Sequence, residues 1–234
     1  MSSLPTLERL SPVHEALEGL KPHWDRLGGM PVALHFGDAQ AEANHAGTVS
    51  LCDASALARL TVKGPGAEAF LIEQGLNPPT DIYAHAPLEH GGLLARTGGA
   101  EFFLEDGPRG ATVAALSEKL ALPRSGVCRV LRQDASFLLG GSEVLQVLAE
   151  TCGVDFRASG SHLVFSRVAG VSCSILKRSF QGADAFQLWL DGTYGPYLWH
   201  TLLEIVVEGR GGPVGLSRFF PELSVNAALK EERT

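Results

Sequence analysis

Apolar and polar residues follow a regular pattern along most of the chain, and the clearest stretch covers residues 49–71. An apolar segment leads into a polar turn at Asp53 and Ser55, whose side chains can accept hydrogen bonds from the local backbone. Alternating residues at 60–62 then predict a strand, and a Gly-Pro-Gly break precedes a helix that begins at Ala67. The pattern predicts strand, turn and helix in that order.

The same plan occurs three times. Residues 60–75 and 137–153 each run from a strand through a glycine turn into a helix with one apolar face, which indicates a degenerate internal repeat. A third copy runs from a strand at 185–190 through an Asp-Gly turn into a strongly apolar helix at 197–207.

Strands that alternate with helices are compatible with a parallel βαβ sheet. However, the strands are short, and residues 92–105 contain a clear hairpin with its turn at 97–99. This pattern favours an α+β fold made of two subdomains, each an antiparallel sheet with helices packed on one face.

Residues 12–27 have apolar positions at helical spacing and predict an amphipathic helix interrupted at Pro22. A strand at 30–37 and a short helix at 38–45 are expected next, and residues 123–126 resemble a joint between two halves. The predicted organisation is an N-terminal helical extension at 1–45, a first α+β subdomain at 46–123, a second at 124–210 and a C-terminal tail at 211–234.

The chain has 234 residues, of which 45% are hydrophobic, and a net charge of −7 with a sequence pI of about 5.6. These values are typical of a globular protein and argue against a nucleic-acid partner, which would require a basic stripe. No apolar run is long enough to cross a bilayer and no secretory signal pattern is present, so we expect no membrane association and a cytoplasmic location.

Four cysteines stand far apart without a Cys-x-x-Cys pair, and eight histidines are scattered singly. Neither pattern indicates a metal site, and we expect none. In a reducing compartment the cysteines are expected to be small buried apolar residues with free thiols.

The order of motifs resembles a known family. Asp-x-Ser at 53–55, the alternating strand and Gly-Pro-x-Ala-x-x-Phe-Leu at 64–71 resemble the folate-binding superfamily of the glycine-cleavage T-protein, an aminomethyltransferase. The resemblance covers about residues 45–210. It implies a T-protein-like α+β fold without the family's C-terminal third domain, and a ligand of the tetrahydrofolate class.

The family's acidic positions are altered. Its Gly-Gly-Ile-x-Asp-Asp hairpin, which carries the catalytic aspartate, corresponds to Gly-Gly-Leu-Leu-Ala-Arg, so that Ala95 and Arg96 stand in the aspartate positions. The glutamate that holds the pterin ring corresponds to Ala183, and the nearest acid is Asp184. Because neighbouring strand residues face opposite sides, a displacement by one residue changes the direction of the carboxylate unless a bulge intervenes.

Because it is short and lacks these acids, the chain is more similar to the gamma subunit of heterotetrameric sarcosine oxidase than to a T-protein. It is also similar to related small subunits of N-demethylating amine oxidases, dehydrogenases and monooxygenases. The segment Gly-Pro-Tyr-Leu-Trp-His at 195–200 resembles the Tyr-Leu-Trp helix of those subunits. The resemblance implies larger oxidoreductase subunits as partners, with flavin, heme or iron–sulfur cofactors located only in them.

A folate site would need an acid for the amino-pyrimidine edge and cations for the glutamate tail. The candidates are Asp184, Arg96, Arg178, Lys177 and Asp53. Each has a structural alternative: Asp184 as a solvated strand residue, Arg96 as a cross-strand partner of Glu101, and Asp53 as part of a turn with Ser55. Candidates for a partner interface are Tyr197, Trp199, His200, Phe219 and Phe220.

Two functions are therefore expected from the sequence. The first is a small folate-binding-type subunit of an amine N-demethylating complex that acts on a sarcosine- or dimethylamine-type substrate. Such a subunit would help to pass formaldehyde to tetrahydrofolate, giving methylene-tetrahydrofolate, or would serve as a scaffold without redox chemistry of its own. The alternative is a stand-alone tetrahydrofolate-dependent aminomethyltransferase.

Overall fold

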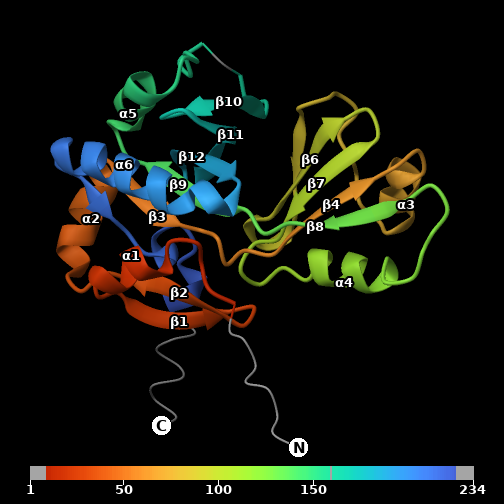
Figure 1. Ribbon diagram of the computed structural model, residues 1–234, viewed down its shortest axis with the longest axis horizontal. Coiled ribbons are helices and arrows are strands. Elements are labelled where there is room, and N and C mark those ends of the chain that lie inside the picture. Colours follow the sequence, from red (N-terminus) through yellow and green to blue (C-terminus); the bar gives the residue numbers. More distant parts are fainter. Residues whose placement is uncertain (1–8, 159, 225–234) are drawn as a thin grey trace, which may run out of the picture.

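The computed structural model describes residues 9–158 and 160–224, which form two bodies side by side (Figure 1). One body contains a six-stranded sheet of order β10-β11-β12-β9-β3-β13, and the other a five-stranded sheet of order β5-β6-β7-β4-β8. A third sheet of two strands, β1-β2, packs against the larger body.

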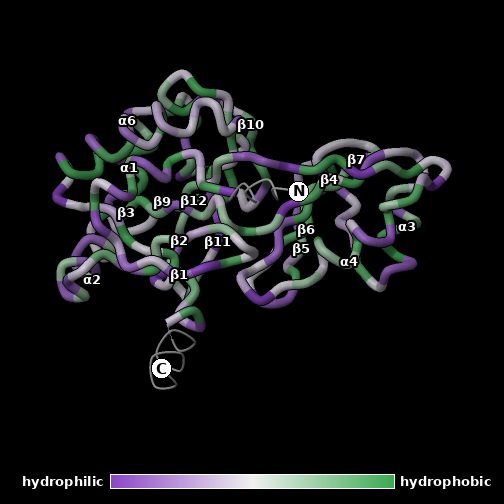
Figure 2. Tube along the Cα trace, turned by 60° about the horizontal axis from the view of Figure 1, so that its bottom comes forward, coloured by the Kyte–Doolittle hydropathy of each residue, from purple (hydrophilic) through white to green (hydrophobic). Residues whose placement is uncertain are grey.

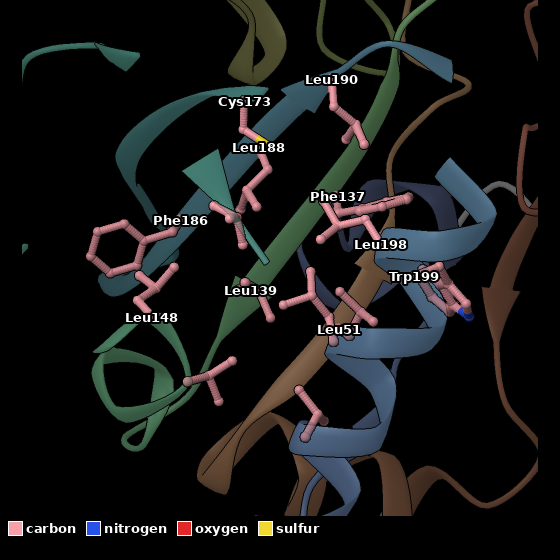
Figure 3. Packing of buried hydrophobic residues seen from close by; sticks show 14 of the residues in the cluster. Leu51, Phe137, Leu139, Leu148, Cys173, Phe186, Leu188, Leu190, Leu198 and Trp199 are labelled. Atoms are coloured by element: carbon pink, nitrogen blue, oxygen red, sulfur yellow. The ribbon is translucent and has the colours of Figure 1, made fainter. Parts of the chain in front are cut away.

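The six-stranded sheet is antiparallel except for the parallel pair β13–β3. Its strands are β3 (Ser50–Asp53), β9 (Ala135–Gly140), β10 (Val164–Val168), β11 (Val171–Phe180), β12 (Ala183–Leu190) and β13 (Gly212–Pro213). Three helices pack on one face, namely α1 (His14–Gly19), α5 (Val144–Thr151) and α6 (Gly195–Glu208). Figure 3 shows Leu198 and Trp199 of α6 beside Phe137 of β9, and the Trp199 and Phe137 rings meet edge to face at 5.4 Å.

The five-stranded sheet carries α3 (Ala67–Glu73) and α4 (Thr112–Lys119) on one face, over a separate core that includes Phe70, Phe102 and Leu116. Its strands are β4 (Arg59–Lys63), β5 (His85–Pro87), β6 (Leu93–Gly98), β7 (Glu101–Glu105) and β8 (Cys128–Leu131). The trace is hydrophobic through much of β4 and β7 (Figure 2), because these central strands contribute to this core.

The other face of the six-stranded sheet is partly covered by β1 (His23–Leu27), β2 (Met30–His35) and residues 214–223. Phe219 and Phe220 both meet the Phe180 ring edge to face there. The remaining elements are α2 (Ala39–Thr48), whose N-terminus is capped by Asp38, and the 3₁₀ turns η1 (Glu89–Gly91), η2 (Gly192–Tyr194) and η3 (Leu216–Arg218).

The predicted repeat has the same geometry in both copies. Strand β4 leads into α3 through Gly64 (φ +117°), and β9 leads into α5 through Gly141 (φ +103°). A Cβ at Gly64 would lie 2.3 Å from the Gly126 carbonyl oxygen, and one at Gly141 would lie 2.4 Å from that of Thr48. Both positions therefore require glycine on two grounds, backbone conformation and space.

The predicted α+β class, with antiparallel sheets and helices on one face of each, is confirmed, and the parallel alternative is excluded. The N-terminal prediction was only partly right. The first helix ends at Gly19, and residues 23–27 form strand β1 paired with β2. The segment at 1–45 is therefore not a purely helical extension over its described part.

The predicted domain boundaries also need correction. Strand β3 precedes the five-stranded sheet in sequence but pairs with β9 in the other body. Strand β8, which follows the predicted joint at 123–126, still pairs with β4. The chain passes from one body to the other at residues 54–58 and returns at residues 132–134. The five-stranded sheet is therefore inserted in the sequence between β3 and β9, which pair with each other in the six-stranded sheet.

Over the described residues, no helix is both long enough and apolar enough to span a bilayer. All four cysteines are free thiols, and Cys52, Cys152 and Cys173 are buried as expected. Cys128 is exposed on β8, which corrects the prediction for that residue.

Candidate functional site

The free faces of the two sheets meet, and the pairing registers determine which residues lie between them. On β4 and β7, Arg59 pairs with Glu105 and Thr61 with Phe103, so that all four lie on the face opposite α3 and α4. On β12, Gln187 and Trp189 occupy the corresponding face of the six-stranded sheet, since Phe186, Leu188 and Leu190 point into the helix-covered core. Three features lie in the space between the sheets: a polar cluster around Glu105, an apolar cluster around Ala95 and a hollow lined in part by Thr61.

Glu105 is the centre of the polar cluster and is fully buried. Its Oε2 accepts hydrogen bonds from Arg59 Nε and Trp189 Nε1, each at 2.7 Å. Its Oε1 accepts one from Gln187 Nε2 at 2.8 Å and lies 3.5 Å from Arg178 Nη1. Donors from both sheets thus converge on one carboxylate, which joins the two bodies and satisfies its desolvated charge.

Arg59 extends the cluster to the two crossing segments. It is 4% exposed and donates from Nη2 to the Ala54 carbonyl at 2.7 Å and from Nη1 to the Asp134 carbonyl at 2.9 Å. Each crossing segment is therefore tied to the same guanidinium group.

The turn at Asp53 and Ser55 is structural. The Ser55 backbone N–H donates to Asp53 Oδ1 at 3.0 Å, and Ser55 Oγ accepts from the Ser136 N–H at 3.0 Å. Burial raises the pKa of Asp53, and hydrogen bonds from Ser11 and Ser55 oppose this shift. The Asp53 carboxylate is occupied in holding the first crossing segment, which fits the structural alternative rather than folate contact.

The apolar cluster surrounds Ala95, the residue that the resemblance to the T-protein family aligns with that family's catalytic aspartate. Ala95 is fully buried on β6 and packs with Phe103, Leu176 and Trp189 in a cluster completed by Leu93 and Leu163. Phe103 and Trp189 meet edge to face at 5.4 Å. Apolar side chains therefore occupy the space that an aspartate carboxylate at position 95 would need.

A hollow of about 290 Å³ opens beyond this cluster. Its lining comes from both bodies and consists of Thr61, Tyr83, Thr97, Glu101, Phe103, Arg132, Leu163, Phe165, Ser174 and Trp189. A shallower hollow of about 600 Å³ adjoins it and shares Arg132, Phe165, Ser174 and Trp189. The inter-sheet space is therefore closed at the polar cluster and open at the Thr61 end.

Arg96 does not face this space. It lies on the α3 side of the five-stranded sheet, where its Nη atoms donate to both carboxylate oxygens of Glu68 at 3.0 and 3.1 Å. The guanidinium also lies 5.0 Å from the centre of the Phe102 ring. The expected Glu101 partner pairs with Lys63 instead, at 2.8 Å, because Arg96 is opposite Phe102 in the hairpin register.

Asp184 faces away from the other sheet as well. It forms an exposed ion pair with Lys177 at 2.6 Å, and both side chains lie on the helix-side face with Phe186. The β11–β12 register runs from Phe180–Ala183 to Cys173–Leu190 without a bulge, so nothing redirects the carboxylate. Ala183, in the family's glutamate position, lies on the opposite face and has no carboxylate.

Arg178 is the one predicted folate residue that lies in the polar cluster. Its Nη1 donates to Gln187 Oε1, and its Nη2 donates to the Gly91 carbonyl. Burial lowers the pKa of Arg178, and the nearby Glu105 charge opposes that shift. Protein groups already occupy this guanidinium, which therefore stabilises the junction.

Three of the five predicted interface residues are buried within the chain itself. Trp199 belongs to the helix-side core, and Phe219 and Phe220 belong to the core around Phe180. This corrects the prediction for those three, because α6 covers its own sheet with its apolar face. Tyr197, 55% exposed, and the exposed His200 remain available to a partner.

Within residues 9–158 and 160–224, no three His, Cys, Asp or Glu side chains are grouped so that they could hold a metal ion. The sequence analysis did not identify the four central residues of the junction, Arg59, Glu105, Gln187 and Trp189. One signal was present: the period of two in Glu-Phe-Phe-Leu-Glu places Glu101 and Glu105 on the same face as Phe103.

Comparison with known proteins agrees with this architecture. No family model matches the chain. An aminomethyltransferase from Moorella thermoacetica is 27% identical over 181 residues, covering 71% of this chain and 49% of that protein. One from Saccharopolyspora erythraea is 24% identical over 224 residues, covering 89% of this chain and 61% of that protein. The chain thus spans about half to three fifths of these relatives.

Two solved structures share the fold. Glycine cleavage system aminomethyltransferase T from Bartonella henselae superposes with a TM-score of 0.64 at 21% identity, covering 90% of this chain and 60% of that one. A chain of heterotetrameric sarcosine oxidase from Corynebacterium sp. U-96 superposes with a TM-score of 0.59 at 18% identity, covering 73% of this chain and 91% of that one. The resemblance found in the sequence is confirmed: this chain is similar to the folate-binding superfamily of the T-protein, and its fold is also that of a sarcosine oxidase chain.

Proposed function

We propose that this chain is the small, T-protein-like subunit of a cytoplasmic complex that removes methyl groups from an amine of the sarcosine or dimethylamine type. The observation that carries the proposal is the difference in coverage. The chain accounts for 91% of a chain in a heterotetrameric oxidase, but for only 49% and 61% of the two curated aminomethyltransferases. A fold match to a chain that itself belongs to a heterotetramer favours assembly with partners over independent catalysis.

In the proposed complex, larger subunits with a flavin, heme or iron–sulfur cofactor would take two electrons from the N-methyl group. Hydrolysis of the resulting iminium would release formaldehyde, which tetrahydrofolate accepts as methylene-tetrahydrofolate when it is bound in the assembly. The exposed Tyr197 and His200 on α6 are candidates for contact with these subunits.

The residues at the family's acid positions do not fit a reduced pterin ring. Ala95 is enclosed by apolar side chains, Arg96 is paired with Glu68, and Ala183 carries no acid. The Asp184 carboxylate is on the far face of its sheet. A role of this chain in folate transfer cannot rest on these residues, which favours the scaffold role for this part of the molecule.

The aminomethyltransferase alternative keeps one supporting observation, since both curated relatives carry that activity in their names. Such an enzyme would work alone. The filled space at Ala95 argues against it, because in the described part of the chain apolar side chains occupy the place that corresponds to the family's catalytic aspartate.

Purification of the tagged full-length chain from its own organism under mild conditions tests the proposal. We expect larger subunits with bound redox cofactors in fixed stoichiometry, identified by mass, and amine-dependent formaldehyde release by the preparation. A matched preparation with Tyr197→Ala and His200→Ala tests the α6 surface. A chain that purifies alone and transfers aminomethyl groups would overturn the proposal in favour of the alternative.

A further inference from the structure

Strand β8 has one edge that no other strand covers. It is the last strand of the five-stranded sheet, beside α4 (Figure 1), and it pairs with β4 alone. Among the described residues, the β8 backbone makes no hydrogen bond to any segment other than β4. The outward N–H and C=O groups of such a strand can pair with a further strand, so the sheet ends here in an open template.

The other outer strands of the two large sheets are better protected. Strands β5 and β13 have three and two residues, and each ends in a proline, which cannot donate to a neighbouring strand. Strand β10 is partly covered, because Val168 forms a β-bridge to Cys152 just after α5. Strand β8 contains neither proline nor lysine, the residues that commonly blunt an edge.

Exposed apolar side chains surround the free edge. Val130 and Leu131 of β8 are 39% and 63% exposed, and Leu122, in the loop before β8, is 79% exposed. Val130 pairs with Thr61 and Leu131 with Leu60, so Val130 and Leu131 lie on opposite faces of the sheet. A strand added to this edge would therefore meet an apolar side chain on each of its two faces.

The charge of this segment is opposite to that of the whole chain. The chain has a net charge of −7, whereas residues 119–132 contain no acid and four cations, namely Lys119, Arg124, Arg129 and Arg132. Ion pairs with acids outside the segment neutralise Arg124 and Arg132. Lys119 and Arg129 donate hydrogen bonds to neutral oxygen atoms, and neither has a carboxylate partner in the described part of the chain. Two uncompensated cations therefore remain in this segment.

These cations decide which kind of chain fits the edge. A second copy of this chain, paired through its own β8, would bring the same uncompensated cations together, which is unfavourable. A segment with acids beside its apolar residues would place opposite charges near Arg129 and Lys119. The edge thus favours an acidic strand from another protein over self-association.

We propose, on the basis of the proposed function, that β8 docks an extended acidic segment of a larger subunit, which pairs with the free edge as a sixth strand. The backbone of that segment supplies partners for the outward N–H and C=O groups of β8, and its apolar side chains cover Val130 and Leu131. Its acids lie near Arg129. This surface is separate from Tyr197 and His200, because α6 packs on the other sheet.

Cys128 provides the readout, because it is the exposed cysteine and lies on β8, whereas the other three cysteines are buried. The full chain is treated with iodoacetamide, alone and in the complex purified from its own organism, and the modified cysteines are identified by mass. In the free chain Cys128 should react first. In the complex its rate should fall about ten-fold or more, because the added strand blocks access to the thiol. Amide hydrogen exchange at 128–131 should slow in parallel.

Two substitutions perturb the edge. Val130→Lys introduces the charge that blunts natural edges, and Arg129→Glu reverses the charge that favours the acidic segment; each should weaken assembly with the larger subunits about ten-fold. Their matched controls are Ile72→Lys, 58% exposed on α3, and Arg109→Glu, exposed before α4, which should assemble like the wild type. Urea denaturation shows whether each variant is folded, and Leu122→Lys gives a third perturbation if a β8 variant unfolds.

A peptide probe tests the edge without the complex. At millimolar concentration, the extended peptide Glu-Val-Thr-Val-Thr-Glu should slow the alkylation of Cys128 in the isolated chain several-fold, because it can pair with β8 and carries acids. The peptide Lys-Val-Thr-Val-Thr-Lys has the same strand-forming centre with the opposite charge and should have little effect.

Equal alkylation rates of Cys128 in the free chain and in the complex would overturn the inference and leave the proposed function intact, as would normal assembly of folded Val130→Lys. If no larger subunit copurifies, the proposed function fails and the peptides decide: no difference between the acidic and the basic peptide would overturn the inference. A free chain that forms a dimer with Cys128 protected would also overturn it, in favour of a second copy.

Discussion

Glu105→Gln is the substitution that most directly tests how the two bodies are held together. It preserves the shape of the side chain while removing its charge and replacing one acceptor oxygen by an NH₂ donor. At present Glu105 receives hydrogen bonds from Arg59, Gln187 and Trp189 within 2.8 Å. Whichever way the new amide is oriented, at least one of these donors faces another donor.

The magnitude follows from burial. Glu105 and Arg59 are 0% and 4% exposed, so the substitution leaves a buried guanidinium without its counter-charge. Breaking a buried ion pair from one side costs about 3–5 kcal/mol. For a chain of this length each kcal/mol corresponds to about 2–4 °C, so the melting temperature should fall by roughly 6–20 °C.

Urea unfolding followed by both tryptophan fluorescence and circular dichroism measures this cost. Trp189 reports directly on the junction because its indole N–H donates to Glu105. Glu101→Gln is the matched control, since Glu101 lies on the same strand and face but forms a half-exposed pair with Lys63. That control should lose no more than about 1 kcal/mol.

A loss below about 1 kcal/mol in Glu105→Gln, equal to that of the control, would refute the reasoning. The double variant Glu105→Gln with Arg59→Met gives an additional check, because removing the orphaned cation should recover part of the stability. No recovery would show that the hydrogen bonds of Arg59 to the crossing segments, rather than its charge, dominate.

Three other predictions follow from single sites. Gly64→Ala should destabilise the chain by at least about 1–3 kcal/mol, because φ is +117° and the new Cβ would lie 2.3 Å from the Gly126 carbonyl oxygen; Gly153→Ala, with open space around it, should have little effect in the same urea assay. Asp184→Ala removes only an exposed pair with Lys177 and should cost less than about 1 kcal/mol, with folate affinity unchanged by calorimetry. Asp53 has a pKa raised by burial, so its contribution is most favourable at low pH and is lost as pH rises through the folded-state value. Asp53→Asn should therefore gain stability relative to the wild type as the pH rises above the ordinary aspartate pKa of about 4, and a relative loss on raising the pH would contradict the shift.

The helices and strands that were predicted well are those with strong local signals. The hairpin at 92–105 and the glycine turns at 64 and 141 depend on neighbouring residues, and the structure has them where the sequence indicated. Residues 23–27 were wrongly predicted as helix because Trp24 and Leu27 also satisfy helical spacing. Their pairing with β2 makes them a strand instead. Pairing partners distant in sequence are not encoded in local periodicity.

The site shows the same limit more sharply. Motif order identified the superfamily, and it also showed that acids were missing at positions 95 and 183. The order of motifs could not show that Glu105 is fully buried at the junction of the two sheets. Its burial and its hydrogen bonds depend on Gln187 and Trp189, which lie on β12 of the other sheet. The direction of Asp184 likewise required the bulge-free register of β11 and β12.

The position of β3 has a consequence for synthesis on the ribosome. Strand β3 emerges before the whole five-stranded sheet, yet its neighbours β9 and β13 emerge only after it. The five-stranded sheet comes from one continuous segment whose ends are adjacent, with Leu60 opposite Leu131, so it can fold while the rest is still being made. Until then, the apolar residues Leu51 and Cys52, which are buried in the folded protein, have no sheet to join and remain exposed in the nascent chain.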